Sequence, residues 1–289
     1  MKKIFLFAVI IIFNQTFCLA QMDSVKLKIQ ELINSSKADV GVSIWGINKN
    51  DTLSIHGNKL YPLMSVVKFH TALAILHQVD QKKLFLDQKV LVKKEDLISD
   101  TFSPMRDEKP KNGFEITIAE LLKYSVSQSD NIAFLKLVDL LNGIKVVDSF
   151  IHKTRVENVS IVSTYRDSFT EILKNVTSPL AANFLLKKFY DGKILKNTSR
   201  EYLINIMIES NTGPDRIKGL LPPEVKVAHK TGTGNDGINK AFNDIGIVIL
   251  PDGKYFFISV FIANSKESDE INASVIASIS KLAYEYFSK

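Results

Sequence analysis

The spacing of hydrophobic and polar residues predicts strands near both ends of the chain and helices between them. Apolar residues recur at helical spacing over residues 25–33, and residues 40–45 then alternate in the manner of a strand. Residues 52–55 are the expected hairpin partner of this strand, across a turn at 48–51. After two consecutive prolines at 222–223, the pattern predicts strands at 225–228, 244–250 and 255–263 and a closing helix at 271–287.

The middle of the chain is predicted to be helical. Residues 65–79 are apolar at nearly every position, which indicates a helix that is buried on most of its sides. Further helices are expected at 118–124, 131–141, 146–152, 180–190 and 199–209. Strict alternation of strands and helices is absent, which argues against a doubly wound parallel sheet. The predicted fold class is therefore α/β of the α+β kind, an antiparallel sheet flanked by N- and C-terminal helices with a helical insertion.

The first 20 residues are predicted to be a signal peptide. Two lysines precede the apolar run at 4–13, and the small residues at 18–20 suit a cleavage site. The apolar run is too short and too early for a membrane span. A lipid anchor on Cys18 is the alternative, but residues 15–17 lack the small residue usually found just before a lipidated cysteine. We therefore expect a periplasmic protein that is cleaved near Ala20.

Composition and charge narrow the possible partners and cofactors. Cys18 is the only cysteine, so the exported chain should form no disulfide and must rely on its hydrophobic core. Loss of Lys2 and Lys3 lowers the formal charge from +6 to +4, and acids lie between the remaining positive charges. Without a basic stripe, a nucleic-acid partner is not expected. The five histidines lack metal-ligand spacing, so we expect no bound metal. We also expect no other cofactor and a monomeric protein.

Three short strings, far apart but in a fixed order, carry the candidate chemistry. They are S-V-V-K from Ser65 to Lys68, S-D-N from Ser129 to Asn131, and K-T-G-T from Lys230 to Thr233. Together they contain the groups needed to acylate a serine with a cyclic amide that bears a carboxylate. Each string alone is weak evidence. A second S-x-x-K at residues 278–281, for example, is interpreted as a chance match on the closing helix.

Ser65 is the expected nucleophile and Lys68 its base. The two residues are three apart on one helix, so their side chains share a face. The backbone N–H of a serine at a helix N-terminus can also stabilise an oxyanion. Lysine acts as a base only when neutral, and burial beside a second cation, here Lys230, lowers its pKa. The alternative is a solvated lysine on an amphipathic helix, but the apolar residues that follow argue against it.

The S-D-N string is expected to serve proton transfer and binding. The Ser129 hydroxyl would pass a proton to the leaving nitrogen, and Asn131 would hold an amide carbonyl of the substrate. Asp130 is expected to fix the loop. The alternative is that S-D-N only caps the helix that follows it, which such strings do very often.

The K-T-G-T string is expected to bind the substrate carboxylate. Gly232 has no side chain, so a substrate can lie along the strand edge there. Lys230 and the hydroxyls of Thr231 and Thr233 supply a cation and hydrogen-bond donors, and the Thr233 N–H can complete an oxyanion hole. Arg216 is either a second cation at this end or an exposed surface arginine, and the sequence leaves both open.

S-x-x-K, S-D-N and K-T-G in this order are the signature of class A β-lactamases and penicillin-binding proteins. The chain resembles class A serine β-lactamases from Ala38 to the closing helix, including the strings S-Q-S-D-N, T-G-P-D-R-I-K-G-L-L-P and H-K-T-G-T. The resemblance implies an α/β domain of residues 21–61 and 211–289, an all-α domain of 62–210, and the serine in the cleft between them. It also implies that Ser65 attacks the carbonyl of β-lactams such as penicillins and cephalosporins, and that the acyl-enzyme is then hydrolysed.

The chain departs from this family in one loop. The family carries a glutamate, written E-x-x-L-N or E-x-x-M-H, that activates the deacylating water, and residues 160–179 contain no such string. The usual interval back from Pro179 ends at Val162. Asp167 and Glu171 are the nearest acids and are candidate substitutes. Loss of a general base typically costs ~10²–10⁴ in rate, so deacylation is expected to be slow.

Two other functions are compatible with the same strings. One is a penicillin-binding protein of the DD-carboxypeptidase kind that acts on peptidoglycan stems. The other is a β-lactam sensor or binding module that is acylated once and stays acylated. We expect the lactamase, because the chain has no membrane segment beside a signalling domain and no added domains of the transpeptidase kind.

Overall fold

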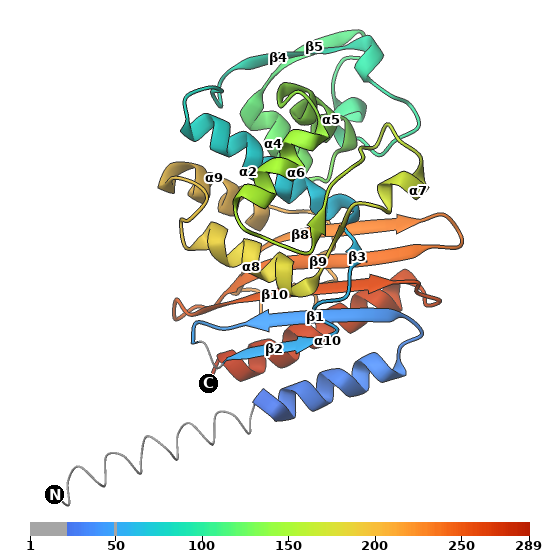
Figure 1. Cartoon of the computed structure of the whole chain (residues 1–289), viewed down its shortest axis with the longest axis vertical. Helices are drawn as coiled ribbons and strands as arrows, with labels where there is room; N and C mark the ends of the chain where they lie inside the picture. The colour runs from blue at the N-terminus through green and yellow to red at the C-terminus, as the bar shows by residue number, and fades with distance from the viewer. Residues whose placement is uncertain (1–21, 49–50) are drawn as a thin grey trace, which may run out of the picture.

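A five-stranded antiparallel sheet organises the molecule (Figure 1). The computed structural model describes residues 22–48 and 51–289. Across the sheet the strands follow the order β2 (Thr52–Ile55), β1 (Asp39–Trp45), β10 (Tyr255–Ala263), β9 (Lys240–Ile249) and β8 (Lys226–Asn235). The first and last parts of the chain therefore meet in one sheet, as the sequence predicted.

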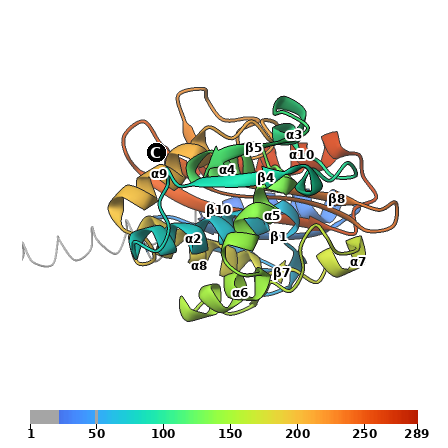
Figure 2. The ribbon, with the colours of Figure 1, turned by 90° about the horizontal axis from the view of Figure 1, so that it is seen from above.

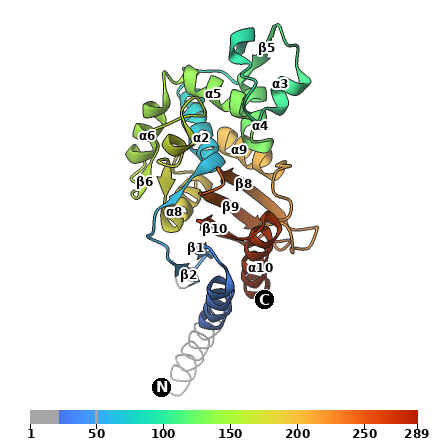
Figure 3. The same ribbon diagram turned by 90° about the vertical axis from the view of Figure 1, so that its right-hand side faces the viewer.

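Helices cover both faces of this sheet, so its central strands are buried almost throughout. Successive side chains of a strand point to opposite faces. Ile258 and Val260 of β10 pack with the N-terminal helix (22–35) and with α10 (Asp269–Phe287). Phe257 and Phe261 of the same strand belong to the core shared with the helical middle of the chain. Figure 3 shows the terminal helices and the helical part on opposite sides of the sheet.

The helix α2 lies at the centre of the helical part. It spans Val67–Asp80, follows the 3₁₀ turn η1 (Met64–Val66), and is buried over its first ten residues, which confirms the predicted buried helix. Figure 2 shows the other helices of this part from above. They are α3 (Pro104–Glu108), α4 (Ile118–Ser127), α5 (Asn131–Leu140), α6 (Ile144–Lys153), α7 (Phe169–Ile172), α8 (Pro179–Tyr190) and α9 (Asn197–Ile208).

The helix α8 fastens the helical part to the sheet. Asn183 of this helix is fully buried and bonds two strands at once. Its Nδ2 donates to Ser43 Oγ of β1 at 3.0 Å, and its Oδ1 accepts from Ser259 Oγ of β10 at 2.7 Å. Every polar group of this buried contact thus has a hydrogen-bond partner, so burying these groups costs little free energy.

Residues 62–210, predicted to be all-α, are predominantly helical but also contain short strands. These are β3 (Tyr61–Pro62), β6 (Val159–Ser160) and β7 (Val176–Thr177), which pair with one another, and the hairpin of β4 (Lys89–Lys93) and β5 (Gly113–Thr117). Two to five residues are too few for a periodic pattern to be recognised, which is why the sequence did not predict these strands.

The largest difference from the predicted elements concerns β8. The apolar pattern predicted a strand that ends at residue 228, yet the strand continues to Asn235. Pairing with β9 is unbroken from Lys226 opposite Ile249 to Asn235 opposite Lys240. The polar and glycine residues of K-T-G-T therefore lie within an edge strand rather than after one, where backbone pairing replaces apolar burial as the reason for extended structure.

The predicted signal peptide at 1–20, its cleavage point near Ala20 and the question of a lipid on Cys18 lie outside the described residues. Within the described ranges, none of the helices has the length and apolar character that crossing a membrane requires. The described chain begins with the N-terminal helix, whose Ile29 and Ile33 are buried beneath the sheet.

Candidate active site

The three strings meet at one cavity of about 280 Å³. Ser65 reaches it from the turn η1, Ser129 and Asn131 from the start of α5, and the threonines of K-T-G-T from β8. The residues that line it are Ser65, Phe102, Ser129, Asn131, Tyr165, Thr212, Arg216, Thr231 and Thr233. Segments more than 160 residues apart along the chain thus form a single chemical site.

Lys68 is placed to accept a proton from Ser65. Its Nζ lies 2.7 Å from Ser65 Oγ and 2.7 Å from Asn131 Oδ1. The lysine has no exposed surface, and both of these partners are neutral. Burial holds the pKa of Lys68 well below its ordinary value, the nearby charge of Lys230 lowers it further, and Asp130 opposes this only in part. A neutral amine beside a serine hydroxyl is the arrangement that base catalysis requires.

Lys230 is fully buried against Ser129 and Thr231, two residues that line the same cavity. Its Nζ donates to Ser129 Oγ and to the Thr231 carbonyl, each at 3.0 Å. Burial lowers the pKa of Lys230 to about 7; Asp244 works against this change, and the charge of Arg216 adds to it. Near neutral pH this lysine therefore exists both as an ammonium and as an amine.

Two residues of the site adopt left-handed backbone conformations. Met64, directly before Ser65, has φ 48°, and Ser129 has φ 58°. Such conformations cost roughly 1–3 kcal/mol for a non-glycine residue and persist only where packing enforces them. Met64 is buried against Ile172 and Ala241. One strained position directly precedes the nucleophile, and the other is the serine expected to protonate the leaving group.

Asp130 fixes the loop around Ser129, as the sequence indicated. It is fully buried, and its Oδ1 accepts the Ala133 N–H at 2.8 Å, so it caps α5. Its Oδ2 accepts from Ser103 Oγ and from the Met105 N–H, each at 2.7 Å. These bonds also hold the segment that carries Phe102 to the cavity wall.

A buried arginine and three hydroxyls close the far end of the cavity. Arg216 Nη2 donates to Thr233 Oγ1 at 2.6 Å, and Nη1 donates to two main-chain carbonyls. Thr231 Oγ1 lies 2.8 Å from Thr212 Oγ1. Arg216 is only 7% exposed, and its guanidinium stacks 3.6 Å above the Phe242 ring. The alternative that Arg216 is an exposed surface residue is therefore wrong.

His229 and Asp244 form a buried pair next to Lys230 along β8 and β9. His229 Nδ1 lies 2.9 Å from Asp244 Oδ2, and neither side chain is exposed. The Asp244 carboxylate also accepts the Ile217 N–H at 3.2 Å. His229 is therefore packed and hydrogen-bonded within the sheet. Asp244 supplies the negative charge that keeps the pKa of Lys230 from falling further.

The two acids proposed as substitute bases lie elsewhere. Asp167 is exposed, and its Oδ2 accepts the Thr164 N–H at 2.8 Å. Glu171 forms an ion pair with Lys174 at 2.5 Å on the outside of α7. Neither lines the cavity that holds Ser65. The expectation that one of them lies beside the nucleophile is therefore corrected, because local contacts within the loop hold both side chains.

Sequence reasoning missed Tyr165 and Thr212. Tyr165 Oη lies 2.8 Å from Ser65 Oγ, and the centre of its ring lies 4.2 Å from Lys68 Nζ. Its loop has no periodic pattern, and its position is set by the path of the loop, so no local signal marked it. Thr212 had a weak signal, because it begins the T-G-P-D-R string that also contains Arg216.

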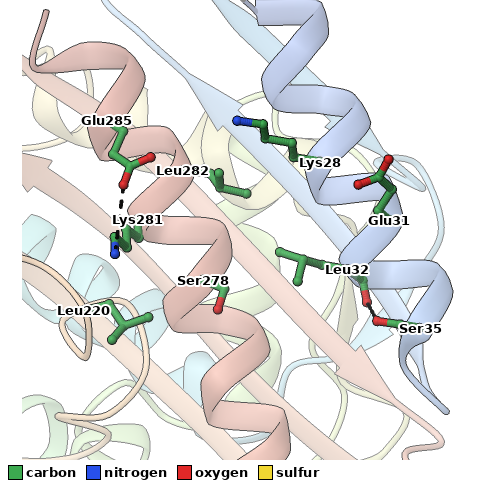
Figure 4. Close-up of a pocket in the computed structure, with 9 residues that line it drawn as sticks. All are labelled: Lys28, Glu31, Leu32, Ser35, Leu220, Ser278, Lys281, Leu282 and Glu285. Carbon is green, nitrogen blue, oxygen red and sulfur yellow. Dashed lines mark hydrogen bonds and ion pairs between the residues drawn. The ribbon is translucent and has the colours of Figure 1, made fainter.

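The second S-x-x-K lies on the other side of the sheet. Ser278 and Lys281 belong to α10 and line a cavity of about 590 Å³ between that helix and the N-terminal helix (Figure 4). Lys281 lies 4.0 Å from Glu285, and the rest of the lining includes Leu220 and Leu282. No residue of S-D-N or K-T-G lines this cavity, which supports the interpretation as a chance match.

Comparison with known proteins points to one family. A family model described as the beta-lactamase enzyme family matches residues 24–287. The chain is 38% identical to Beta-lactamase VEB-1 of Pseudomonas aeruginosa over 294 aligned residues, which cover 99% of this chain and 98% of the relative. It is 36% identical to Extended-spectrum beta-lactamase PER-1 of the same organism, with coverage of 92% and 88%. The crystal structure of TLA-3 extended-spectrum beta-lactamase matches with a TM-score of 0.90 at 40% identity and coverage of 93% and 100%.

The lowered pKa of Lys230 predicts that the folded protein loses stability as the pH falls. Between pH 10.5 and about 7 the lysine is neutral in the folded state but charged in the unfolded state, so the unfolded state binds more protons. The free energy of unfolding should therefore rise with pH across this window. Because one pKa unit corresponds to about 1.4 kcal/mol, we expect wild type to lose up to ~5 kcal/mol relative to Lys230→Met on going from the top to the bottom of the window.

Urea denaturation of both proteins at matched pH values measures this difference. Lys226→Met is the control, since Lys226 is an exposed lysine of the same strand, and its pH dependence should match that of wild type. Equal pH dependence of wild type and Lys230→Met would contradict the prediction.

Proposed function

Since the chain belongs to the beta-lactamase enzyme family, as a class A serine β-lactamase that hydrolyses β-lactams, we propose that its reaction passes through an acyl-enzyme on Ser65. The contact of 2.7 Å between Ser65 Oγ and the buried amine of Lys68 carries this proposal. The substrates would be β-lactam antibiotics such as penicillins and cephalosporins. The relatives named above are β-lactamases, and they align with nearly the full chain. This favours β-lactam hydrolysis over the function of a DD-carboxypeptidase or a sensor module.

In the proposed acylation, the amine of Lys68 takes the Ser65 proton as Oγ attacks the lactam carbonyl. The bond between Oγ and the carbonyl carbon forms, and the bond from that carbon to the ring nitrogen breaks. The nitrogen takes the Ser129 proton, and Ser129 recovers a proton from Lys230 Nζ, which is 3.0 Å away. Lys68 gains one proton, from Ser65, and Lys230 loses one, to Ser129, so the summed charge of the two buried lysines is the same before and after acylation.

The remaining groups of the site would orient the substrate and stabilise charge. The backbone N–H groups of Ser65 and Thr233 are the proposed oxyanion donors. Asn131 Oδ1 is bound to Lys68 and its Nδ2 donates to Thr101 Oγ1 at 2.9 Å, so its amide is already oriented before substrate arrives. We propose that it then donates its second Nδ2 proton to an amide carbonyl of the substrate.

The substrate carboxylate would bind at the end of the cavity formed by K-T-G-T. Thr231 and Thr233 line this end and supply hydroxyl donors. Lys230, which is buried behind them and bonded to the Thr231 carbonyl, would supply a positive charge. Arg216 is hydrogen-bonded to Thr233 Oγ1 rather than exposed, so it adds positive potential through that contact. Charge-assisted bonds of this kind are stronger than neutral ones.

We also propose that the protein is exported and acts as a periplasmic monomer after cleavage of residues 1–20. The charged start, apolar run and small residues at 18–20 support this proposal. Within the mature chain, we propose an α/β domain of residues 21–61 and 211–289 and a mainly helical domain of 62–210. The arrangement of the cavity lining supports this division, because the lining comes from both segments.

Ser65→Ala should abolish covalent labelling by a penicillin and leave the fold intact, because it removes only the oxygen that faces Lys68. Intact-protein mass spectrometry should show one adduct on wild type and none on the variant, and thermal unfolding should report equal stability within about 1 kcal/mol. Ser278→Ala is the matched control, since it removes the serine of the other S-x-x-K, and it should label like wild type. An adduct on Ser129, or one that survives Ser65→Ala, would contradict the assignment.

Lys230→Ala should slow acylation by carboxylate-bearing β-lactams far more than it lowers stability. A lost charge-assisted contact of ~1.5–3 kcal/mol corresponds to a decrease of about 10- to 100-fold. Arg216→Ala should give a smaller decrease, because the Arg216 guanidinium bonds Thr233 Oγ1 and acts on the substrate carboxylate through that contact. Stopped-flow acylation with a penicillin and with its carboxylate ester separates the two roles: the loss shared by both compounds reports the proton that Lys230 supplies to Ser129, and the additional loss with the free acid reports carboxylate binding. Parallel losses with both compounds and in unfolding free energy would indicate a structural lysine.

The acyl-enzyme should accumulate during turnover, because no carboxylate lines the cavity among the described residues. We expect a burst of about one product per active site followed by a slow steady state. A mass spectrum of cephalosporin-treated enzyme, quenched at successive times, measures the fraction acylated. Asp167→Asn and Glu171→Gln should leave both phases unchanged, since both side chains bond elsewhere. Fast steady turnover in all three proteins would show that another group, such as Lys68, activates the water efficiently.

A further inference from the structure

The side chain of Tyr165 covers both groups that react in the proposed acylation. Its Oη lies 2.8 Å from Ser65 Oγ, and the centre of its ring lies 4.2 Å from Lys68 Nζ. Phe134 of α5 packs edge-on against this ring, with 5.4 Å between ring centres and an angle of 80°. The phenol is thus held between the nucleophile, the base and a buried aromatic residue.

The hydrogen bonds around Ser65 determine which group donates to which. When Lys68 is neutral, one of its protons goes to Asn131 Oδ1, and its lone pair faces Ser65 Oγ. The single Ser65 proton must point at that lone pair for base catalysis. Ser65 Oγ is then an acceptor toward Tyr165, and the phenol is the donor. Burial raises the pKa of Tyr165 to about 12, so the phenol keeps this proton at neutral pH.

The ring of Tyr165 also separates Lys68 from the open cavity. Tyr165 lines the cavity and Lys68 has no exposed surface, although Ser65 and Asn131, which it bonds, both reach the cavity. The charged groups that act on Lys68 are Lys230 from β8 and Asp130 at the start of α5. The face of an aromatic ring attracts an ammonium, but exclusion of water disfavours the charged form more strongly. The net effect of this surrounding is a neutral amine.

We propose that Tyr165 is a further catalytic residue, whose hydroxyl directs the Ser65 proton onto Lys68 and whose ring keeps water away from that amine. This inference rests on the proposed acyl-enzyme mechanism. The phenol transfers no proton in acylation and only donates a hydrogen bond to Oγ. In the acyl-enzyme Oγ is an ester oxygen, and Tyr165 remains a donor to it. A protonated phenol is not the acceptor for a proton of the deacylating water.

Two substitutions separate the hydroxyl from the ring. Tyr165→Phe removes only the donor, and we expect the acylation rate constant to fall about tenfold, as for a hydrogen bond of ~1–1.5 kcal/mol, with no shift in the pH dependence. Tyr165→Ala admits water to Lys68, so the acid limb of the acylation pH profile should move to higher pH by one unit or more. Stopped-flow acylation by a penicillin between pH 4 and pH 9 measures both quantities.

A control variant and a second variant of Tyr165 complete this test. Tyr202→Phe removes a partly buried phenol of α9 that bonds the Ala119 carbonyl at 2.7 Å, and it should acylate like wild type. If Tyr165→Ala does not fold, Tyr165→Leu keeps apolar packing against Phe134 but covers less of Lys68 than the ring, so a smaller shift in the same direction is expected. Wild-type rates for Tyr165→Phe, or an unmoved acid limb in the smaller variant that folds, would overturn the inference. Failure of wild type itself to become labelled on Ser65 would overturn the proposed function instead.

Discussion

The active site depends on the burial of two lysines at one cavity with no carboxylate bonded to either. Lys68 and Lys230 have no exposed surface, and their Nζ atoms bond only hydroxyl, amide and carbonyl oxygens. Two ammonium groups buried in this way would cost several kcal/mol each. The pKa values of both are lowered for this reason, so the site holds fewer protons than two solvated lysines would. The amine can then act as the base while the ammonium binds an anion.

The fold maintains this unfavourable pair by surrounding it with rigid elements. Lys68 projects from a helix that is buried over its first ten residues, and Lys230 from a strand paired along its length with β9. Asp244, itself paired with His229, lies close enough to moderate the pKa of Lys230 without bonding it. The left-handed backbone at Ser129 is anchored by the adjacent buried carboxylate that caps α5. Two strained backbone positions and two buried lysines without a bonded carboxylate therefore lie where the chemistry takes place.

The sequence predicted the helices and strands that have long periodic apolar patterns, and the site residues that belong to the three strings. The helix after Ser65 and the strand at 255–263 have long apolar patterns, and both are confirmed. The end of β8 was misplaced because backbone pairing, rather than apolar burial, keeps K-T-G-T extended. Burial of Arg216 could not be distinguished from exposure, since it depends on β8, β9 and the Phe242 ring meeting in space. No sequence pattern indicated Tyr165 either, because the path of an aperiodic loop determines which side chain lies over Ser65.

A phenol over the nucleophile has different consequences from a carboxylate at the same place. A carboxylate beside Lys68 would pair with it and raise its pKa, so the lysine would stay charged and the acid itself would become the base. Tyr165 is neutral at neutral pH, so it leaves the Lys68 amine neutral and available to the Ser65 proton. A phenol in place of a carboxylate also leaves this position without a group that can accept a proton from the deacylating water. Among the groups that face Ser65 Oγ, Lys68 is then the one that can accept a proton in both half-reactions, and it must release the serine proton before it can act on water.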